Sequence, residues 1–232
     1  MNFIHIADLH VSKTRAEPCK RVLETVLAKI EETEDTPKLI ISGDFFDASI
    51  NAGPTYGMFM SLMKKILNVT DVYMVYGTAH HEPADSLKGF ALLGAHVYSM
   101  NTFEDCGDFE VVALPEPRRV NYTNYVKEGD DINEVINKMN EEFINGLPSK
   151  TKPRIVIGHG EILGVLFDSS LPCDSPVAWK PSLLKKINAD YYAFGHIHNK
   201  QEVFENCWYA GSAYQKTFGE LHDPGYIFVT IE

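Results

Sequence analysis

Tyr-Tyr-Ala-Phe-Gly-His-Ile-His, residues 191–198, is the stretch of this sequence that decides the fold. Four apolar residues run into a glycine and then into two histidines that are separated by one isoleucine. Such an apolar run predicts a buried strand, and alternate side chains along a strand point to opposite sides. His196 and His198, at the carboxyl end of the expected strand, can therefore serve two different metal ions, or one metal and one substrate.

Three other apolar runs also end in carboxylates or imidazoles: residues 3–7 before Asp8 and His10, residues 39–42 before Asp44, and residues 155–157 before His159. Open α/β sheets place their sites at the carboxyl ends of strands, so these four ends can converge on one crevice. Carboxylates and imidazoles without thiolates favour Mn²⁺, Fe²⁺ or Zn²⁺ over calcium or an all-sulfur zinc site. A set of about seven ligands is too large for one ion and suits two.

These blocks resemble the calcineurin-like metallophosphoesterase superfamily, whose pattern is D-x-H, G-D-x-x-D, G-N-H-[DE], G-H and G-H-x-H in that order. Four of the five blocks stand intact, and the resemblance covers the whole chain. Within the superfamily, residues 3–10 look like the opening of SbcD-type DNA repair exonuclease subunits. The runs at residues 208–212, 218–220 and 225–226 resemble the same subunits.

The resemblance implies one metallophosphoesterase domain over residues 1–232, with an α/β fold built as a four-layer α/β/β/α sandwich. Two mixed sheets would pack face to face, because apolar strands need cover on both faces from helices and a second sheet. Apolar residues at the 3.6-residue period predict helices from Pro18 to about Ile30 and from about Pro54 to Leu67. The further strands are expected around residues 72–76, 109–114, 154–157, 191–194, 202–204, 207–210 and 226–231.

The same resemblance implies a division of the ligands between two divalent ions, with Mn²⁺ expected and Fe²⁺, Zn²⁺ or Mg²⁺ as alternatives. Asp44 would bridge the two ions. The first ion would be held by Asp8, His10 and His198, and the second by His159 and His196. Two such ions can share a water, lower its pKa and present a bridging hydroxide for in-line attack on phosphorus.

One block departs from the family's pattern. Where G-N-H-[DE] is expected, the sequence reads Gly-Thr-Ala-His-His-Glu, residues 77–82. Matched from its right end, the block makes His81 the catalytic general acid and Glu82 the acidic residue that orients neighbouring groups. His80 then replaces the metal-binding asparagine, since imidazole can substitute for an amide oxygen. The alternative is that His80 faces solvent and that a water or Thr78 fills the coordination position.

The charge bears on the substrate. Net charge is −11, the reverse of the basic balance of a general nucleic-acid binder. A phosphodiester would therefore have to be held by the metals and by a local basic group. Arg118 and Arg119 are the candidate substrate-binding residues, because arginines beside tyrosines can contact phosphate and stack on a base. The alternative is a surface loop with partly buried tyrosines.

We therefore expect a manganese-dependent DNA exo/endonuclease subunit that acts with an SbcC-like ATPase, whose more basic surface would supply much of the DNA affinity. A homodimer is a second expected assembly. A small-molecule or cyclic-nucleotide phosphodiesterase is one alternative, and a non-catalytic scaffold of this fold is another. A phosphoprotein substrate is disfavoured, because Ala48-Ser49 stands where the Ser/Thr phosphatases of the family carry Arg-Gly. SbcD-type enzymes carry a DNA-capping region beyond the strand at residues 226–231, and we expect either that this region has been removed here or that the protein is a compact variant.

Composition points to a cytoplasmic protein. The four cysteines lie far apart without a C-x-x-C pair, which is typical of reduced thiols. Asp8 and His10 interrupt the first apolar stretch, which rules against a signal peptide. The sequence has no run near the ~20 apolar residues that a membrane span requires.

Overall fold

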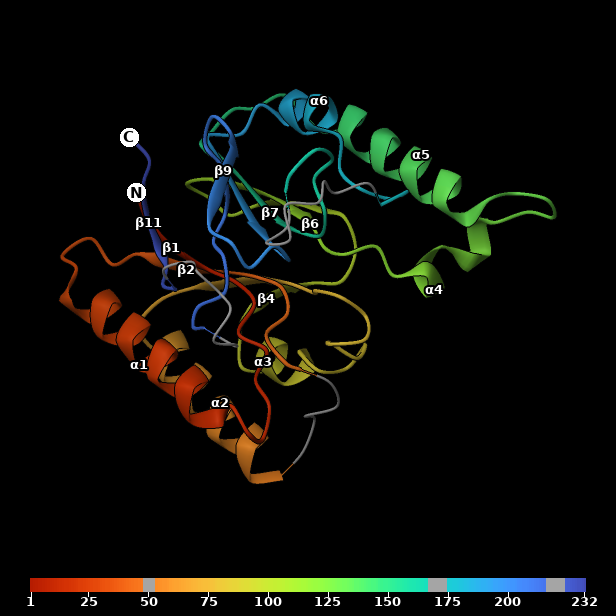
Figure 1. Ribbon diagram of the computed structural model, residues 1–232. Coiled ribbons are helices and arrows are strands. Elements are labelled where there is room, and N and C mark those ends of the chain that lie inside the picture. Colours follow the sequence, from red (N-terminus) through yellow and green to blue (C-terminus); the bar gives the residue numbers. More distant parts are fainter. Residues whose placement is uncertain (48–52, 167–174, 216–223) are drawn as a thin grey trace.

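The computed structural model describes residues 1–47, 53–166, 175–215 and 224–232, and it contains two β-sheets packed face to face between helices (Figure 1). The first sheet has the strand order β11 (Ile227–Thr230), β1 (Asn2–Ile6), β2 (Lys38–Ser42), β3 (Val72–Val75), β4 (His96–Tyr98). The second has the order β5 (Thr102–Asp105), β6 (Glu110–Leu114), β7 (Arg154–His159), β8 (Tyr191–Gly195), β10 (Cys207–Tyr209), β9 (Gln201–Phe204).

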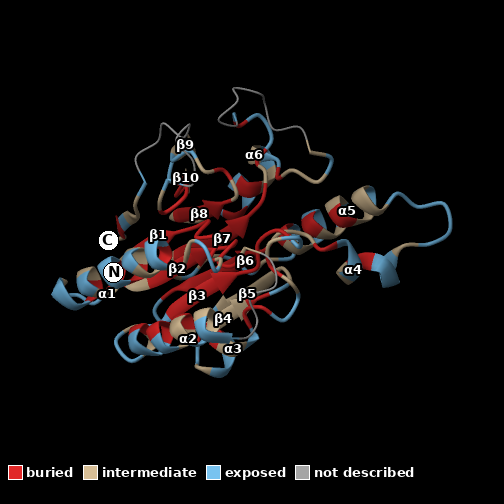
Figure 2. Cartoon of the chain, turned by 60° about the horizontal axis from the view of Figure 1, so that its bottom comes forward, coloured by how far each residue is buried: buried red, intermediate tan, exposed pale blue. Residues whose placement is uncertain are grey.

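Parallel pairing dominates the middle of both sheets. Strands β1 to β4 run parallel, as do β6, β7, β8 and β10, while β11, β5 and β9 pair antiparallel at the edges. The central strands are buried along almost their whole length, which explains their continuous apolar sequences (Figure 2). Parallel pairing also puts the carboxyl ends of β1 and β2, and of β7 and β8, at one edge of each sheet.

Helices cover the outer faces. The first sheet is covered by α1 (Ala16–Glu32), α2 (Gly53–Leu67) and α3 (Lys88–Leu92), and the second by α5 (Ile132–Asn145) and α6 (Pro181–Leu184). The remaining short elements are α4 (Arg119–Tyr122) and the 3₁₀ turns Thr123–Tyr125 and Lys185–Ile187. Three apolar clusters fill the spaces under each helical layer and between the sheets. The expected four-layer α/β/β/α sandwich is confirmed.

The sequence prediction missed the edge strands β4 and β5, the long helix α5, and the short helices and 3₁₀ turns. The edge strands β4 and β5 are only partly buried and mix polar with apolar residues, so they give no apolar run. Helix α5 is rich in asparagine and glutamate, and only Ile136, Asn140 and Ile144 are buried along it. Asp131 begins this helix by accepting a hydrogen bond from the Asn133 N–H. Residues 48–49 and 218–220, which entered the sequence comparison, lie outside the described residues.

Helices that could cross a membrane are absent from the described part of the chain, because none is both long and apolar enough.

A buried ion pair ties the amino end of β7 to β6. Arg154 and Glu110 have side chains only 3% and 4% exposed, and Nε of Arg154 donates to Oε2 of Glu110 at 2.7 Å. The guanidinium also donates to the carbonyls of Ile187 and Pro148, so its charge is surrounded by acceptors. Both charges depend on each other, because neither can reach water.

Replacing Arg154 by Met should therefore destabilise the fold by about 3–5 kcal/mol, since it leaves the Glu110 carboxylate buried and unpaired. The double variant E110L/R154M should recover most of that loss, because apolar groups of similar size replace both charges. Urea unfolding of the three proteins measures the effect. Equal stability of the single and double variants would contradict this account.

Candidate metal centre

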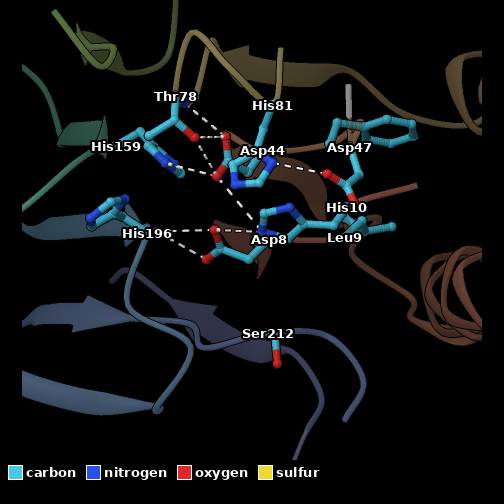
Figure 3. Close-up of polar contacts among 12 residues, drawn as sticks. Asp8, Leu9, His10, Asp44, Asp47, Thr78, His81, His159, His196 and Ser212 are labelled. Atoms are coloured by element: carbon cyan, nitrogen blue, oxygen red, sulfur yellow. Dashed lines mark hydrogen bonds and ion pairs between the residues drawn. The ribbon is translucent and has the colours of Figure 1, made fainter. Parts of the chain in front are cut away.

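Strand ends from both sheets bring the predicted ligands to one place (Figure 3). Asp8 and His10 follow β1, and Asp44 follows β2. Their loops are joined directly, because the His10 N–H donates to the Asp44 carbonyl at 2.9 Å. From the second sheet, His159 ends β7 and His196 follows β8. The backbone N–H of His196 donates to both carboxylate oxygens of Asp8, at 2.9 and 3.1 Å, and so joins the two sheets at the site.

Three compact groups of side chains could each hold a metal ion, with ligand atoms within 4.8 Å of one another: Asp8–His10–His198, His10–Asp44–His81, and Asp8–Asp44–His159. The first group contains the three residues predicted for one ion. Asp44 belongs to both of the others, as a bridging carboxylate requires. The candidate site is therefore a shared cluster rather than three separate sites.

The contact between Asp44 and His159 indicates that the cluster binds a cation. Nδ1 of His159 donates to the Ser42 carbonyl at 2.7 Å, so Nε2 carries the lone pair in the neutral ring. Nε2 is buried 3.5 Å from Oδ2 of Asp44 and has no hydrogen-bond partner among the described residues. A lone pair facing a carboxylate is unfavourable, and a cation between them removes the conflict. The donor set therefore fits a divalent metal.

The pKa values of this pair lead to the same conclusion. Burial alone would lower the pKa of His159, but the facing carboxylate of Asp44 raises it to about 10. Burial works to raise the pKa of Asp44, yet His159 and His10 hold it well below its usual range. Positive charge is thus stabilised at this position, whether a proton or a metal supplies it.

A buried hydrogen-bond chain fixes His159 from behind. Oγ of Ser42 donates to the Ala193 carbonyl at 2.9 Å, so it accepts the Nε2–H of His5 at 3.1 Å. Nδ1 of His5 in turn accepts from the Tyr191 hydroxyl at 3.0 Å. Burial lowers the pKa of His5 to about 3, which keeps this ring neutral. The chain anchors Ser42, whose carbonyl orients the ligand His159.

Backbone strain is concentrated at the same residues. Asp8, His10, Asp44 and His196 have φ angles of 53°, 45°, 48° and 105°, a region that non-glycine residues rarely adopt. These four account for most of the six non-glycine residues with positive φ in the described chain. Such strain persists where surrounding contacts hold the side chain in a functional position.

In the altered block, residues 77–82, Thr78 and not His80 contacts the central carboxylate Asp44. The Thr78 N–H donates to Oδ1 of Asp44 at 2.7 Å, and its hydroxyl lies 2.8 Å from both carboxylate oxygens. Gly77 makes this approach possible, because a Cβ there would collide with the Asp44 carboxylate. His80 is exposed and belongs to none of the three ligand groups. The structure thus favours the alternative in which His80 faces solvent.

Glu82 ties this loop to the loop that carries Asp44. Its buried carboxylate accepts the backbone N–H groups of Gly77, Phe45 and Phe46, at 2.7, 2.8 and 3.3 Å. Burial raises the pKa of Glu82 to about 7, with a contribution from the nearby Asp44 carboxylate. Glu82 therefore orients the loops that carry Asp44 and Thr78 by binding their backbone N–H groups, which agrees with the role predicted for it.

His81 lies at the rim beside the ligands. Its Nδ1 is 2.9 Å from Oδ1 of Asp47, and its ring packs edge-on against His10 with centroids 4.5 Å apart. Arg15 holds the other oxygen of Asp47 at 3.1 Å. The carboxylate therefore accepts a hydrogen bond from the Nδ1–H, and Nε2 lies on the opposite side of the ring. This is the geometry of a histidine that is oriented for proton transfer.

His196 is placed less centrally than predicted. Its ring centroid is 5.4 Å from that of His159, and Nε2 lies 3.8 Å from Oε1 of Glu161. Burial, together with the charge of His159, lowers the pKa of His196 to about 4. His196 is near the second ion's ligands but outside the compact groups found among the described residues.

The two predicted substrate arginines serve the scaffold. Arg118 is only 7% exposed, its guanidinium lies 4.7 Å from the Tyr76 ring centroid, and it donates to the carbonyls of Gly77 and Glu82. It therefore clamps the altered block. Arg119 is exposed on α4 and donates to Asn133 at 3.2 Å. Neither arrangement presents an arginine to the ligand cluster.

The sequence analysis missed the residues that hold the ligand His159 in place through hydrogen bonds. His5 and Ser42 belong to runs that were read only as apolar strands. Their signal is a polar residue inside an otherwise apolar strand, because a buried polar side chain needs a specific partner.

Asp44→Asn should weaken Mn²⁺ binding by more than about 100-fold, because it removes a charge that two ligand groups share. Asp47→Asn makes the same chemical change three residues later and should leave occupancy unchanged, as should His80→Ala. Metal analysis after dialysis and calorimetric Mn²⁺ titration measure these effects. Loss of one metal equivalent in His80→Ala would restore His80 as a ligand.

Comparison with solved structures finds two chains that are similar to this one. A nuclease MPE from Pseudomonas putida is 18% identical, with a TM-score of 0.36, over 72% of this chain and 64% of that one. GAP50, the anchor in the inner membrane complex of Plasmodium, is 14% identical, with a TM-score of 0.51, over 98% of this chain and 80% of that one. The chain thus spans about 64% of the nuclease's length. No curated protein matches its sequence.

The family comparison is more direct. The sequence profile of the calcineurin-like phosphoesterases matches residues 1–200, which include all the compact ligand groups. Members of this family use two divalent metals, and the described ligand cluster fits such a pair. The chain belongs to the calcineurin-like phosphoesterase family.

Proposed function

We propose that this chain is a two-metal phosphodiesterase that cleaves DNA, as the nuclease subunit of a complex with an SbcC-like ATPase. The observation that carries the catalytic part is His81, held by Asp47 at 2.9 Å beside the ligand His10. A scaffold that only kept the fold has no need of an oriented histidine at the rim of a cluster of metal-ligating side chains. The proposal therefore favours an enzyme over a scaffold.

The chain's own residues supply binding and proton transfer. Asp8, His10 and His198 would hold one ion, and Asp44 and His159 the other. When bound, divalent ions supply Lewis acidity for the phosphoryl oxygens and a nucleophilic water. His81 would give a proton to the leaving oxygen from Nε2, while Asp47 keeps the ring in the required orientation.

The DNA assignment rests on the SbcD-like opening at residues 3–10. Such a substrate requires a basic partner, because the chain carries a net charge of −11 and Arg118 is committed to its own loop. The same two facts favour a second candidate function, a phosphodiesterase for a small or cyclic diester. A small diester needs little surface beyond the metal centre.

A substrate panel with Mn²⁺ distinguishes the candidates. We expect cleavage of single-stranded and linear duplex DNA and of an aryl phosphodiester, with little hydrolysis of an aryl phosphomonoester. Asp44→Asn, purified in parallel, should be inactive on all of them and so excludes a contaminating nuclease. Hydrolysis of the aryl diester and a cyclic nucleotide without DNA cleavage would favour the small-substrate enzyme. Failure on every substrate with both ions bound would favour the scaffold.

The proton donor can be tested separately. His81→Ala should keep both ions bound but reduce turnover by roughly 10²–10⁴-fold, the usual contribution of a general acid. His80→Ala is the matched control, an exposed imidazole next in sequence, and should retain nearly full turnover. Excess Mn²⁺ should not rescue His81→Ala, because a proton donor acts without changing metal affinity. Rescue by Mn²⁺ would instead identify His81 as a ligand of the group it shares with His10 and Asp44.

A further inference from the structure

Glu116 is a carboxylate at the metal centre that the proposed chemistry does not use. It follows β6, whose carboxyl end pairs with that of β7, and its N–H donates to the Tyr76 carbonyl at 3.1 Å. The side chain lies directly over Gly160, the residue after His159. Gly160 has a φ of 118°, and a Cβ there would collide with Oε2 of Glu116. The carboxylate thus lies against the backbone of a ligand loop.

This carboxylate is not paired. Among the residues that the structure describes, Glu116 has no side-chain hydrogen bond and no ion pair within 4 Å. Burial raises its pKa to about 7, and the carboxylates of Asp44 and Glu161 add to the rise while His159 opposes it. The indole N–H of Trp179, a residue only 2% exposed, also lacks a partner in that part of the chain. Its Nε1 lies 3.9 Å from the same Cβ position on Gly160.

The Glu116 carboxylate would stabilise a cation bound on the His159 side of the cluster, whereas the indole N–H of Trp179 could only donate to an acceptor. Glu116 is half-buried, and a carboxylate that is partly removed from water near two further carboxylates is destabilised. Thr78 follows Gly77, and its hydroxyl contacts Asp44, so a second ion would not have the asparagine ligand of the family's pattern. The negative charge of Glu116 and the position where the pattern has asparagine both lie on the His159 side of the cluster.

We propose that Glu116 is a charge-compensating residue that raises the affinity of the second ion, the one assigned to Asp44 and His159, and so offsets the loss of the asparagine. Glu116 lies outside the compact ligand groups, so it acts on the ion as a neighbouring charge. The proposal rests on the metal-dependent activity inferred above, but it concerns metal affinity and is independent of the substrate.

Calorimetric Mn²⁺ titration tests this role with Glu116→Gln, which removes the charge and keeps the shape. The second binding step should weaken about 10- to 100-fold, the usual effect of an outer partner, while the first step is unchanged. Glu161→Gln is the matched control, because Glu161 already accepts the Ser175 N–H and lies beside His196. It should change the second step less. Glu116→Asp, which keeps the charge, should retain most of the affinity.

Thermal unfolding without and with Mn²⁺ separates this role from a structural one. Metal-free Glu116→Gln should be at least as stable as the unmodified protein, because it removes a charge that is repelled by the carboxylates of Asp44 and Glu161, and it should gain less from Mn²⁺. A lower metal-free melting temperature with an undiminished Mn²⁺ gain, or unchanged second-step affinity, would overturn the proposal. The DNA assignment fails on a different result, namely intact two-step Mn²⁺ binding without DNA cleavage.

Discussion

The contact between Asp44 and the imidazoles around it is the constraint on which the rest of the site depends. Asp44 is 3% exposed, with His159 and His10 nitrogens 3.5 and 3.7 Å from Oδ2. A buried carboxylate can be kept at such a point only by donors and cations. Glycines at positions 43 and 77 give it room, because a Cβ at either would collide with His159 or with Asp44 itself.

The two sheets contribute to this site through their shared interior. His5 lies between them and bonds both Tyr191 of β8 and Ser42 of β2, so a polar chain crosses an otherwise apolar interface. Because the Ser42 carbonyl accepts from His159, a shift of one sheet against the other would displace a ligand. The inter-sheet packing therefore determines the geometry of the metal centre as well as the stability of the fold.

The sequence predicted the positions of those strands and ligands that follow from a single physical rule. Continuous apolar runs identify parallel central strands, and parallel strands deliver their terminal residues to one edge, so Asp8, Asp44 and His159 could be predicted together. The sequence could not predict whether Thr78 or His80 contacts Asp44, because both residues lie in one loop and only the path of that loop decides it. Arg118 was misread for a related reason: a charged residue in an irregular segment carries no signal that it will be buried against its own backbone.

Charge links metal binding to substrate binding at this site. Asp8, Asp44 and nearby carboxylates make the metal-free cluster negative, and the buried Arg118 beside it already donates to backbone carbonyls. A phosphodiester would therefore be repelled from the empty cluster and attracted once cations are bound. By linkage, a bound diester must strengthen ion binding by the same factor that the ions strengthen its own. An acidic protein can thus act on an anionic substrate, provided that cation binding comes first.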